Sequence, residues 1–194
     1  AEAAFGDYDV SFGGTGKVLI PGIISAAALV QQADGKLVVA GLRGDSGNPR
    51  TPFDDQEMFA LVRCNPDGTL DATFGGGTGI VTTSIDARAR ASGLVERADG
   101  KLVVAGSSAD STTMYSVFAL ARYNPDGTLD TSFGEGTGIV RTSIGINAQA
   151  SAIVEQTDGT LVVAGSAGDN GASTMFALAR YTADGILDTS FGGG

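Results

Sequence analysis

The sequence predicts an all-β repeat protein, and two observations carry this prediction. One short phrase returns three times at nearly constant spacing, and between its copies short apolar runs alternate with tight Asp-Gly turns. No stretch shows the sustained 3.6-residue spacing of apolar residues, with caps, that an α-helix needs. We therefore expect short antiparallel strands and no helix longer than one turn.

Three phrases recur in step along the chain. The corner phrase L-D-x-[ST]-F-G begins at Leu70 and returns 59 and then 58 residues later, with a looser copy at 8–13. A D-G-x-L-V-V-A-G phrase occupies 34–41, 99–106 and 158–165, and an F-A-L phrase occupies 59–64, 118–123 and 176–181. Self-similarity at such a period is typical of repeat architectures, so the recurrence decides the fold class.

Each copy is expected to contain four short strands. In the second copy these are 79–84, 92–96, 101–106 and 118–123. The turn at 97–100 ends in Asp-Gly, where glycine takes the positive φ that a hairpin needs. The turn at 124–127 reads Asn-Pro-Asp-Gly, in which proline presets one corner and glycine supplies the left-handed residue.

The strands carry apolar side chains on both faces, as a sheet that is covered on both sides requires. In the strand 176–181, Phe176 and Leu178 point one way, while alanines point the other way and permit close stacking. A unit of 58 or 59 residues suits a four-stranded propeller blade better than a β-helix rung. We predict a β-propeller-type protein with three four-stranded blades. The segments are an N-terminal tail 1–7, blades 8–69, 70–128 and 129–186, and the beginning of a further repeat at 187–194.

The phrases at 34–41 and 118–134 resemble the delta-60 repeats of bacterial secreted proteins, a β-propeller repeat family of unknown function. The resemblance extends over 8–192. It implies a propeller-like fold and an extracellular or cell-envelope location, and it brings no catalytic residues. The chain departs from the pattern at Cys64, where the other copies have tyrosine, and at Thr182-Ala183, which replaces Asn-Pro.

Composition excludes several classes of function. The 194 residues carry a net charge of −10, with no His, no Trp and one Cys. An acidic surface repels phosphate, so no nucleic-acid partner is expected. Without His there is no Ser-His-Asp triad, and Cys64 alone excludes a disulfide framework or a four-Cys zinc site. The longest apolar stretch, 18–30, is broken by Pro-Gly and is too short to cross a membrane. The opening Ala-Glu-Ala-Ala is what signal-peptide cleavage leaves, which favours secretion over a boundary chosen for expression.

One acid, one arginine and one phenylalanine recur once per copy, and all three are expected to build the repeat. The sets are Asp71, Asp130 and Asp188; Arg63, Arg122 and Arg180; and Phe74, Phe133 and Phe191. For the acids, an Asx-turn is favoured over a cation or sugar site. The arginines are expected to pair with a neighbouring acid or cover a blade edge. The phenylalanines are expected to be largely buried and to lock the corner between successive units.

One loop varies between copies, and it lies between the third and fourth strands, at 42–58, 107–117 and 166–175. Variation confined to one loop is how repeat proteins usually acquire binding specificity. In the first copy, Asp54, Asp55 and Glu57 are candidate oxygen ligands for a cation such as Ca²⁺. They lack the spacing of an EF-hand loop, so a solvated acidic loop is favoured and no other cofactor is expected.

Two further features have structural explanations. The glycine-rich segment 75–79 lacks the Lys-Ser/Thr of a phosphate-binding loop and opens a strand rather than a helix. Cys64 stands at an aromatic position of a strand, so a buried thiol is favoured over an intermolecular disulfide.

Two classes of function remain open. The first is a non-enzymatic extracellular module with a structural, adhesive or ligand-binding role towards a carbohydrate or protein. The alternative is a hydrolase or lyase that acts on an extracellular polymer through paired carboxylates in a central channel. A catalytic pair should break the repeat, whereas the acids that we can place recur with it, so the first class is favoured. Two or more non-repeated polar side chains in one concavity would indicate the second.

The number of units predicts an assembly. Three blades are too few for a closed ring, since propellers usually need about 4–8. The N-terminal copy of the corner phrase continues into an expected strand, 17–20, whereas the C-terminal copy stops at Gly194. One chain is therefore expected to complete another, as a homodimer that forms a six-bladed ring or, less favoured, as a head-to-tail filament. The sequence also allows a fragment of a longer chain.

Overall fold

The computed structural model describes residues 7–44, 57–109, 111–113, 115–168 and 174–193. These residues form eleven strands and two 3-10 helices of three residues each, Gly75–Gly77 and Phe191–Gly193. The prediction of an all-β chain with no helix longer than one turn is confirmed for the described residues. The loop acids Asp54 and Asp55, and the N-terminal residues 1–6, lie outside them.

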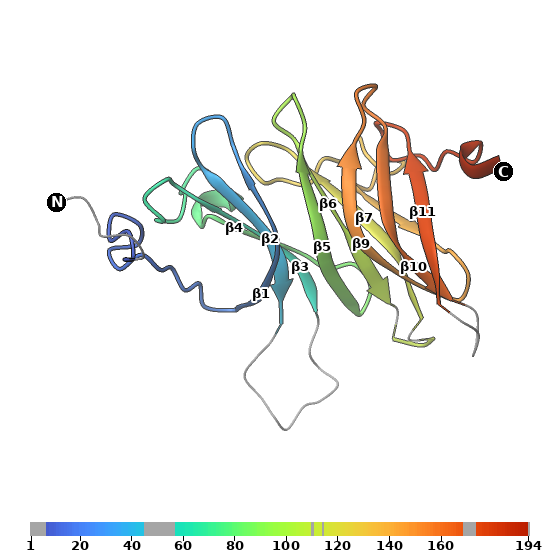
Figure 1. Cartoon of the computed structure of the whole chain (residues 1–194), viewed down its shortest axis with the longest axis horizontal. Coiled ribbons are helices and arrows are strands. Elements are labelled where there is room, and N and C mark those ends of the chain that lie inside the picture. The colour runs from blue at the N-terminus through green and yellow to red at the C-terminus, as the bar shows by residue number, and fades with distance from the viewer. Residues whose placement is uncertain (1–6, 45–56, 110, 114, 169–173, 194) are drawn as a thin grey trace.

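The strands form three antiparallel sheets. The first is β1 (Ile23–Gln31), β2 (Leu37–Arg43), β3 (Met58–Cys64) and β4 (Ile80–Thr83). The second is β5 (Arg88–Glu96), β6 (Leu102–Ala109), β7 (Ser116–Tyr123) and β8 (Ile139–Thr142). The third is β9 (Asn147–Glu155), β10 (Leu161–Gly168) and β11 (Met175–Tyr181), so among the described residues it has three strands rather than the expected four. The sheets stand in a row, with the first and the third sheet at its two ends (Figure 1).

The sheets begin and end one strand later in the sequence than the units expected at 8–69, 70–128 and 129–186. Residues 80–83 were expected to open the second unit, but they pair with β3 of the first sheet, where Leu61 lies opposite Val81. The backbone explains this: the Arg63 N–H donates to the Gly79 carbonyl, and the Asp71 N–H donates to the Arg63 carbonyl, both at 2.9 Å. The corner is thereby tied to β3, and the chain that follows it runs alongside β3.

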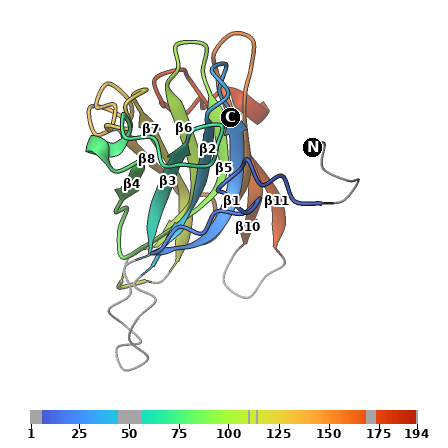
Figure 2. The same ribbon diagram turned by 90° about the vertical axis from the view of Figure 1, so that its left-hand side faces the viewer.

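The strand that opens each sheet in the sequence, β1, β5 or β9, is called its inner strand, and the fourth strand, β4 or β8, is called its outer strand. Viewed from the side of the first sheet, β1 and β4 lie at its opposite edges and the second sheet lies behind it (Figure 2). The inner strands carry a bulge, at 91–93 in β5. There the neighbouring strand needs a glycine, because a Cβ on Gly106 would lie 2.0 Å from the Arg90 carbonyl oxygen.

The core consists of two layers, one between each pair of neighbouring sheets. Phe59 and Leu61 of β3 belong to the layer that contains Ala119 and Ala121 of β7. Phe118 and Leu120 of β7 belong to the second layer, with Ala177 and Ala179 of β11. The face that carries large side chains therefore packs on the alanine face of the next sheet, which confirms the expected two-faced strands.

The corner phenylalanines are buried only where a further sheet follows. Phe74 and Phe133 are fully buried, as predicted, whereas Phe191 is only half-buried, which corrects the prediction for that residue. Phe74 lies beneath the turn of the second sheet, where a Cβ on Gly127 would be 2.8 Å from its ring. Phe133 lies in the same way beneath Gly185 of the third sheet. Among the described residues, no further sheet covers Phe191.

Candidate functional site

The repeated acid and arginine form one ion pair per corner. The Arg63 Nε donates to Asp71 Oδ2 at 2.6 Å, and Arg122 and Arg180 make the same bond to Asp130 and Asp188. The other carboxylate oxygen of Asp71 accepts the backbone N–H and the hydroxyl of Thr73. Both the Asx-turn and the Arg–acid pair are confirmed.

These arginines also join neighbouring sheets. The Arg63 Nη1 donates to the Pro125 carbonyl at 2.6 Å, and the Arg122 Nη1 donates to the Ala183 carbonyl at 2.7 Å. Each guanidinium lies over its corner phenylalanine, with Arg122 4.7 Å from the centre of the Phe133 ring. In the first two copies, the side chains that recur with the repeat therefore hold neighbouring sheets together.

The corner pairs should make stability depend on acid pH. Burial acts to raise the pKa of Asp71, but the hydrogen bonds from Thr73 and the ion pair with Arg63 outweigh it and lower the pKa to about 2. A depressed carboxyl pKa stabilises the folded state above the ordinary value of 3.8, and this stabilisation is lost as the pH falls through about 2. We expect Asp71 to contribute about 2 kcal/mol. Urea unfolding at a series of pH values checks this, and an Asp71→Asn chain should lose less stability across the same window.

Of the candidate cation ligands Asp54, Asp55 and Glu57, only Glu57 lies among the described residues. Its carboxylate accepts the Nε of Arg90 at 2.7 Å and the Nη2 at 2.5 Å. Within the described part of the chain, no three acidic or cysteine side chains are grouped as a metal site. Cation binding by this loop stays a prediction. Cys64 is buried as predicted, and burial raises the pKa of its thiol.

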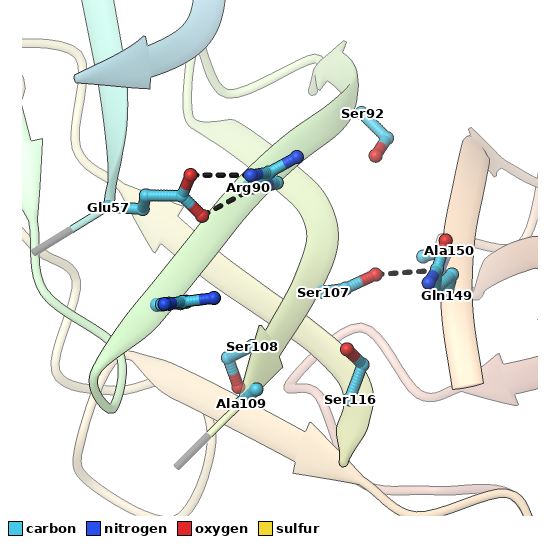
Figure 3. A pocket seen from close by; sticks show the side chains of 10 residues that line it. Glu57, Arg90, Ser92, Ser107, Ser108, Ala109, Ser116, Gln149 and Ala150 are labelled. Atoms are coloured by element: carbon cyan, nitrogen blue, oxygen red, sulfur yellow. Dashed lines mark hydrogen bonds and ion pairs between the residues drawn. The ribbon is translucent and has the colours of Figure 1, made fainter. Parts of the chain in front are cut away.

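A polar pocket of about 250 Å³ lies where the three sheets meet (Figure 3). Glu57, immediately before β3, comes from the first sheet, and Gln149 of β9 comes from the third. The second sheet supplies most of the lining: Arg88, Arg90 and Ser92 of β5, Ser107, Ser108 and Ala109 of β6, and Ser116 of β7. We call this site the three-sheet pocket.

The charged residues of the three-sheet pocket break the repeat. The position of Arg88 is occupied by Ile23 and Asn147 in the other sheets, and that of Arg90 by Ser25 and Gln149. Glu57 corresponds to Ser116 and Thr174. The convergence of non-repeated polar side chains that would indicate an enzyme is therefore present, but among the described lining residues Glu57 is the single carboxylate and Arg90 already binds it.

The serines of β6 fix one wall of the pocket. The Ser107 hydroxyl accepts the Ala150 N–H at 3.0 Å (Figure 3), and the Ser108 hydroxyl donates to Asp86 at 2.9 Å. Asp86 has a φ of 57°, a left-handed conformation that glycine adopts at the equivalent Gly145. Its carboxylate also pairs with Arg141 at 2.8 Å, so the connection that leads into β5 is bound to both β6 and β8.

A wider groove of about 870 Å³ lies at the other end of the inner strands, and its described lining contains three carboxylates, those of Glu96, Glu155 and Asp158. Glu96 and Glu155 occupy equivalent repeat positions there. Glu96 accepts the Gln32 side-chain amide at 2.7 Å, and Glu155 pairs with Arg97 at 3.1 Å. Asp158 recurs as Asp34 and Asp99 and accepts the N–H and the hydroxyl of Thr160. All three acids are therefore partnered, which does not favour a catalytic pair.

The two end sheets expose apolar surfaces. On the third sheet, Phe176 is 77 % exposed and Leu178 is 44 % exposed, whereas the equivalent Phe59 and Phe118 are fully buried. On the face of the first sheet that points away from the second sheet there is an apolar groove of about 380 Å³. Its lining comprises Phe12, Val18, Leu19, Ile20, Ile23, Ile24, Ser25, Ala26, Leu37, Val39, Val62 and Cys64.

Stacked antiparallel sheets, joined at each corner by the same Arg–Asp–Phe group, define an all-β repeat protein. The model of a β-propeller repeat family described as a domain of unknown function (DUF5122) matches residues 32–74, 97–133 and 156–191. The chain belongs to this family, and the resemblance to delta-60 repeats is confirmed. No curated protein matches the chain. Among the described residues, no helix has the length and apolar character to span a membrane.

Proposed function

We propose that this chain is a non-enzymatic structural module that assembles head to tail with a second copy into a closed six-bladed β-propeller. The observation that carries this proposal is the exposure of Phe176, because its two counterparts are each covered by the next sheet. An exposed apolar sheet face is a surface that soluble proteins normally cover. An extracellular location stays a prediction that cell fractionation can check.

The two exposed faces suit each other. The third sheet exposes Phe176, Leu178 and Val154, which is the kind of face that packs on a following sheet. The groove on the first sheet lies on the face that, in the second and third sheets, receives a preceding one. A second copy can therefore place its first sheet against the third sheet of the first copy and repeat the two internal junctions.

The pairing of the outer strands in the first two sheets indicates how a strand would add to the free edge of β11. Phe59 and Phe118 lie opposite Thr83 and Thr142 in the outer strands β4 and β8. The outer strands align in sequence with 17–20. Within the described ranges these residues form no strand, contrary to the strand that we expected there. In the same register, Ile20 of a second copy lies opposite Phe176 and Val18 lies opposite Leu178. Such strand addition satisfies the backbone groups of an open edge.

The N-terminal segment already lies where a preceding unit would end. The Gly13 N–H donates to the Asp67 carbonyl at 2.7 Å, as the Gly75 N–H donates to the Asp126 carbonyl at 2.9 Å. Phe12 and Val18 approach Gly68 as Phe74 and Val81 approach Gly127. The segment before β1 thus keeps the geometry of a corner and carries 17–20 beside the first sheet.

In the junction, the N-terminal segment of the second copy and the C-terminal segment of the first copy compete for the same place. Residues 8–13 and 187–192 carry the same corner phrase, and only one acid can pair with Arg180. Asp9 forms the same Asx-turn, to Ser11, that Asp188 forms to Ser190. In the junction, Asp9 of the second copy replaces Asp188 at Arg180, and the last residues of the first chain are displaced.

The assembly is tested by light scattering after gel filtration. We expect the chain to elute as a dimer, because a two-fold rotation brings six sheets into one ring. Phe176→Asp should give a monomer, since the charge would be buried in the junction. Tyr115→Asp is the matched control, because Tyr115 is an exposed aromatic residue immediately before β7 of the second sheet, away from both ends. A 19.4 kDa species at micromolar concentration would refute the proposal, and a ladder of larger species would replace the ring by a filament.

A further inference from the structure

We propose that the three-sheet pocket binds a small acidic sugar unit, with the Arg88 guanidinium as the anchor for its carboxylate. This binding does not depend on the assembly, because the lining residues of the pocket lie between the sheets rather than on the exposed end faces. The pocket can therefore be tested in the monomer and in the dimer.

The anchor is a guanidinium that the fold does not otherwise use. Arg90 donates two of its nitrogens to Glu57, and the hydrogen bonding to Glu57 raises the pKa of Arg90. Arg88 lines the same pocket, and among the described residues its side chain has neither a hydrogen bond nor an ion pair. The described lining residues include two guanidinium groups and one carboxylate and so carry one net positive charge, in a chain whose net charge is −10. An anion is thus attracted to the pocket and repelled by the molecule as a whole.

The departure from the repeat supports a ligand rather than a packing role. Arg90 has a structural explanation, because its pair with Glu57 joins the first sheet to the second. Arg88 has none, since Ile23 and Asn147 stand at the same position of the other inner strands without a charge. Arg88 and Arg90 line the same pocket, and a bound anion would reduce the repulsion between their like charges. The planar fork of a guanidinium matches a carboxylate in particular.

The rest of the lining suits hydroxyl groups. The side chains of Ser92, Ser116 and Gln149 lie on three different strands and have no hydrogen-bond partner within the described ranges. They supply both donors and acceptors around the anchor. The part of the lining that the structure describes contains no aromatic ring for stacking on a sugar face. A ligand with one carboxylate and several hydroxyl groups uses every polar group that remains free.

The volume limits the ligand to about one ring. A cavity of about 250 Å³ is smaller than the clefts of about 300–1,000 Å³ that hold drug-sized molecules. A hexuronate unit fits this limit and carries one carboxylate. The wall beside it is already fixed, because Ser107 and Ser108 are bonded to Ala150 and Asp86, so little ordering is needed on binding.

The test compares D-glucuronate with D-glucose, which differ only in the carboxylate at C6. Each is titrated into the ¹⁵N-labelled chain, and shifts of the backbone amides are followed by NMR. We expect glucuronate to shift the amides of 88–92 and 149–150 in a saturable way, while glucose binds at least about tenfold more weakly, as the loss of a charge-assisted hydrogen bond implies. Sodium sulfate is the third arm, and it should bind more weakly than glucuronate because it carries no hydroxyl groups.

The decisive variant is Arg88→Asn, because Asn147 shows that the inner strand accepts asparagine at this position. It should weaken glucuronate binding at least about tenfold and leave the remaining spectrum unchanged. Arg43→Asn is the matched control, since Arg43 is an exposed strand arginine outside the pocket, and it should change nothing. The proposal is overturned if glucuronate gives no saturable shifts, if glucose or sulfate binds as tightly, or if Arg88→Asn binds glucuronate like the parent chain.

Discussion

Replacing Phe133 by alanine should lower the free energy of unfolding by about 3–5 kcal/mol. The ring is fully buried in the layer between the second and third sheets, and it lies against Gly185, where any side chain would collide with it. Removing it leaves a cavity that glycine cannot fill, and it also removes the surface over which the Arg122 guanidinium lies. Urea unfolding followed by circular dichroism measures the change.

Phe191→Ala is the matched control for this substitution. Phe191 occupies the same place in its corner phrase and lies under Arg180 at 4.7 Å, but it is only half-buried. Its replacement should cost clearly less than that of Phe133 if burial between sheets is the cause. Equal losses for the two variants would show that the phenylalanine stabilises its own corner rather than the contact with the next sheet.

Replacing Asp130 by alanine should also lower the free energy of unfolding, by about 3–5 kcal/mol. The buried carboxylate pairs with Arg122 and with Lys101, both at 2.7 Å, and accepts the N–H and hydroxyl of Ser132. Without it, the buried Arg122 guanidinium loses its buried charged partner and keeps its bonds to Ser132 and to the Ala183 carbonyl and a longer, solvent-exposed contact with Asp184 at 3.7 Å. The same unfolding measurement applies.

Asp188→Ala provides the comparison, because Asp188 and Arg180 form the same pair with much more exposure to solvent. Its loss should cost about 1 kcal/mol or less, as expected of a pair near the surface. If Asp130→Ala is no more harmful than Asp188→Ala, the corner pairs do not hold the sheets together, and the role that we assign to Arg122 is wrong.

The repeating features could be predicted from the sequence because three copies of the same phrase restrict the interpretation. Asp71 recurs with a threonine or serine two residues later, which is the spacing of an Asx-turn, and Arg63 recurs at a constant distance from it. A role present in every copy is part of the scaffold, and the structure confirms this for both residues. The burial of Phe74 followed from the same argument.

The remaining features could not be predicted because they depend on contacts between copies. The phase of the sheets depends on the hydrogen bonds between β3 and the corner, and a repeat has no visible beginning in the sequence. The pair of Glu57 with Arg90 joins residues 33 positions apart on two different sheets, so no local spacing reveals it. One signal was present: positions 88 and 90 carry arginine where the other copies are uncharged.

Unfolding should spread along the row of sheets rather than stop between them. The corner segments 65–79 and 124–138 each end in the outer strand of one sheet and rest beneath the turn of the next. If one sheet melts, its neighbour loses both an apolar cover and the anchor of a corner, so the three sheets share a single cooperative transition. A cut in 84–87 leaves every sheet with all its strands, whereas a cut in 65–79 detaches an outer strand from the sheet to which it belongs. The points at which the molecule can be divided are therefore the links between sheets, one strand later than the repeated phrases indicate.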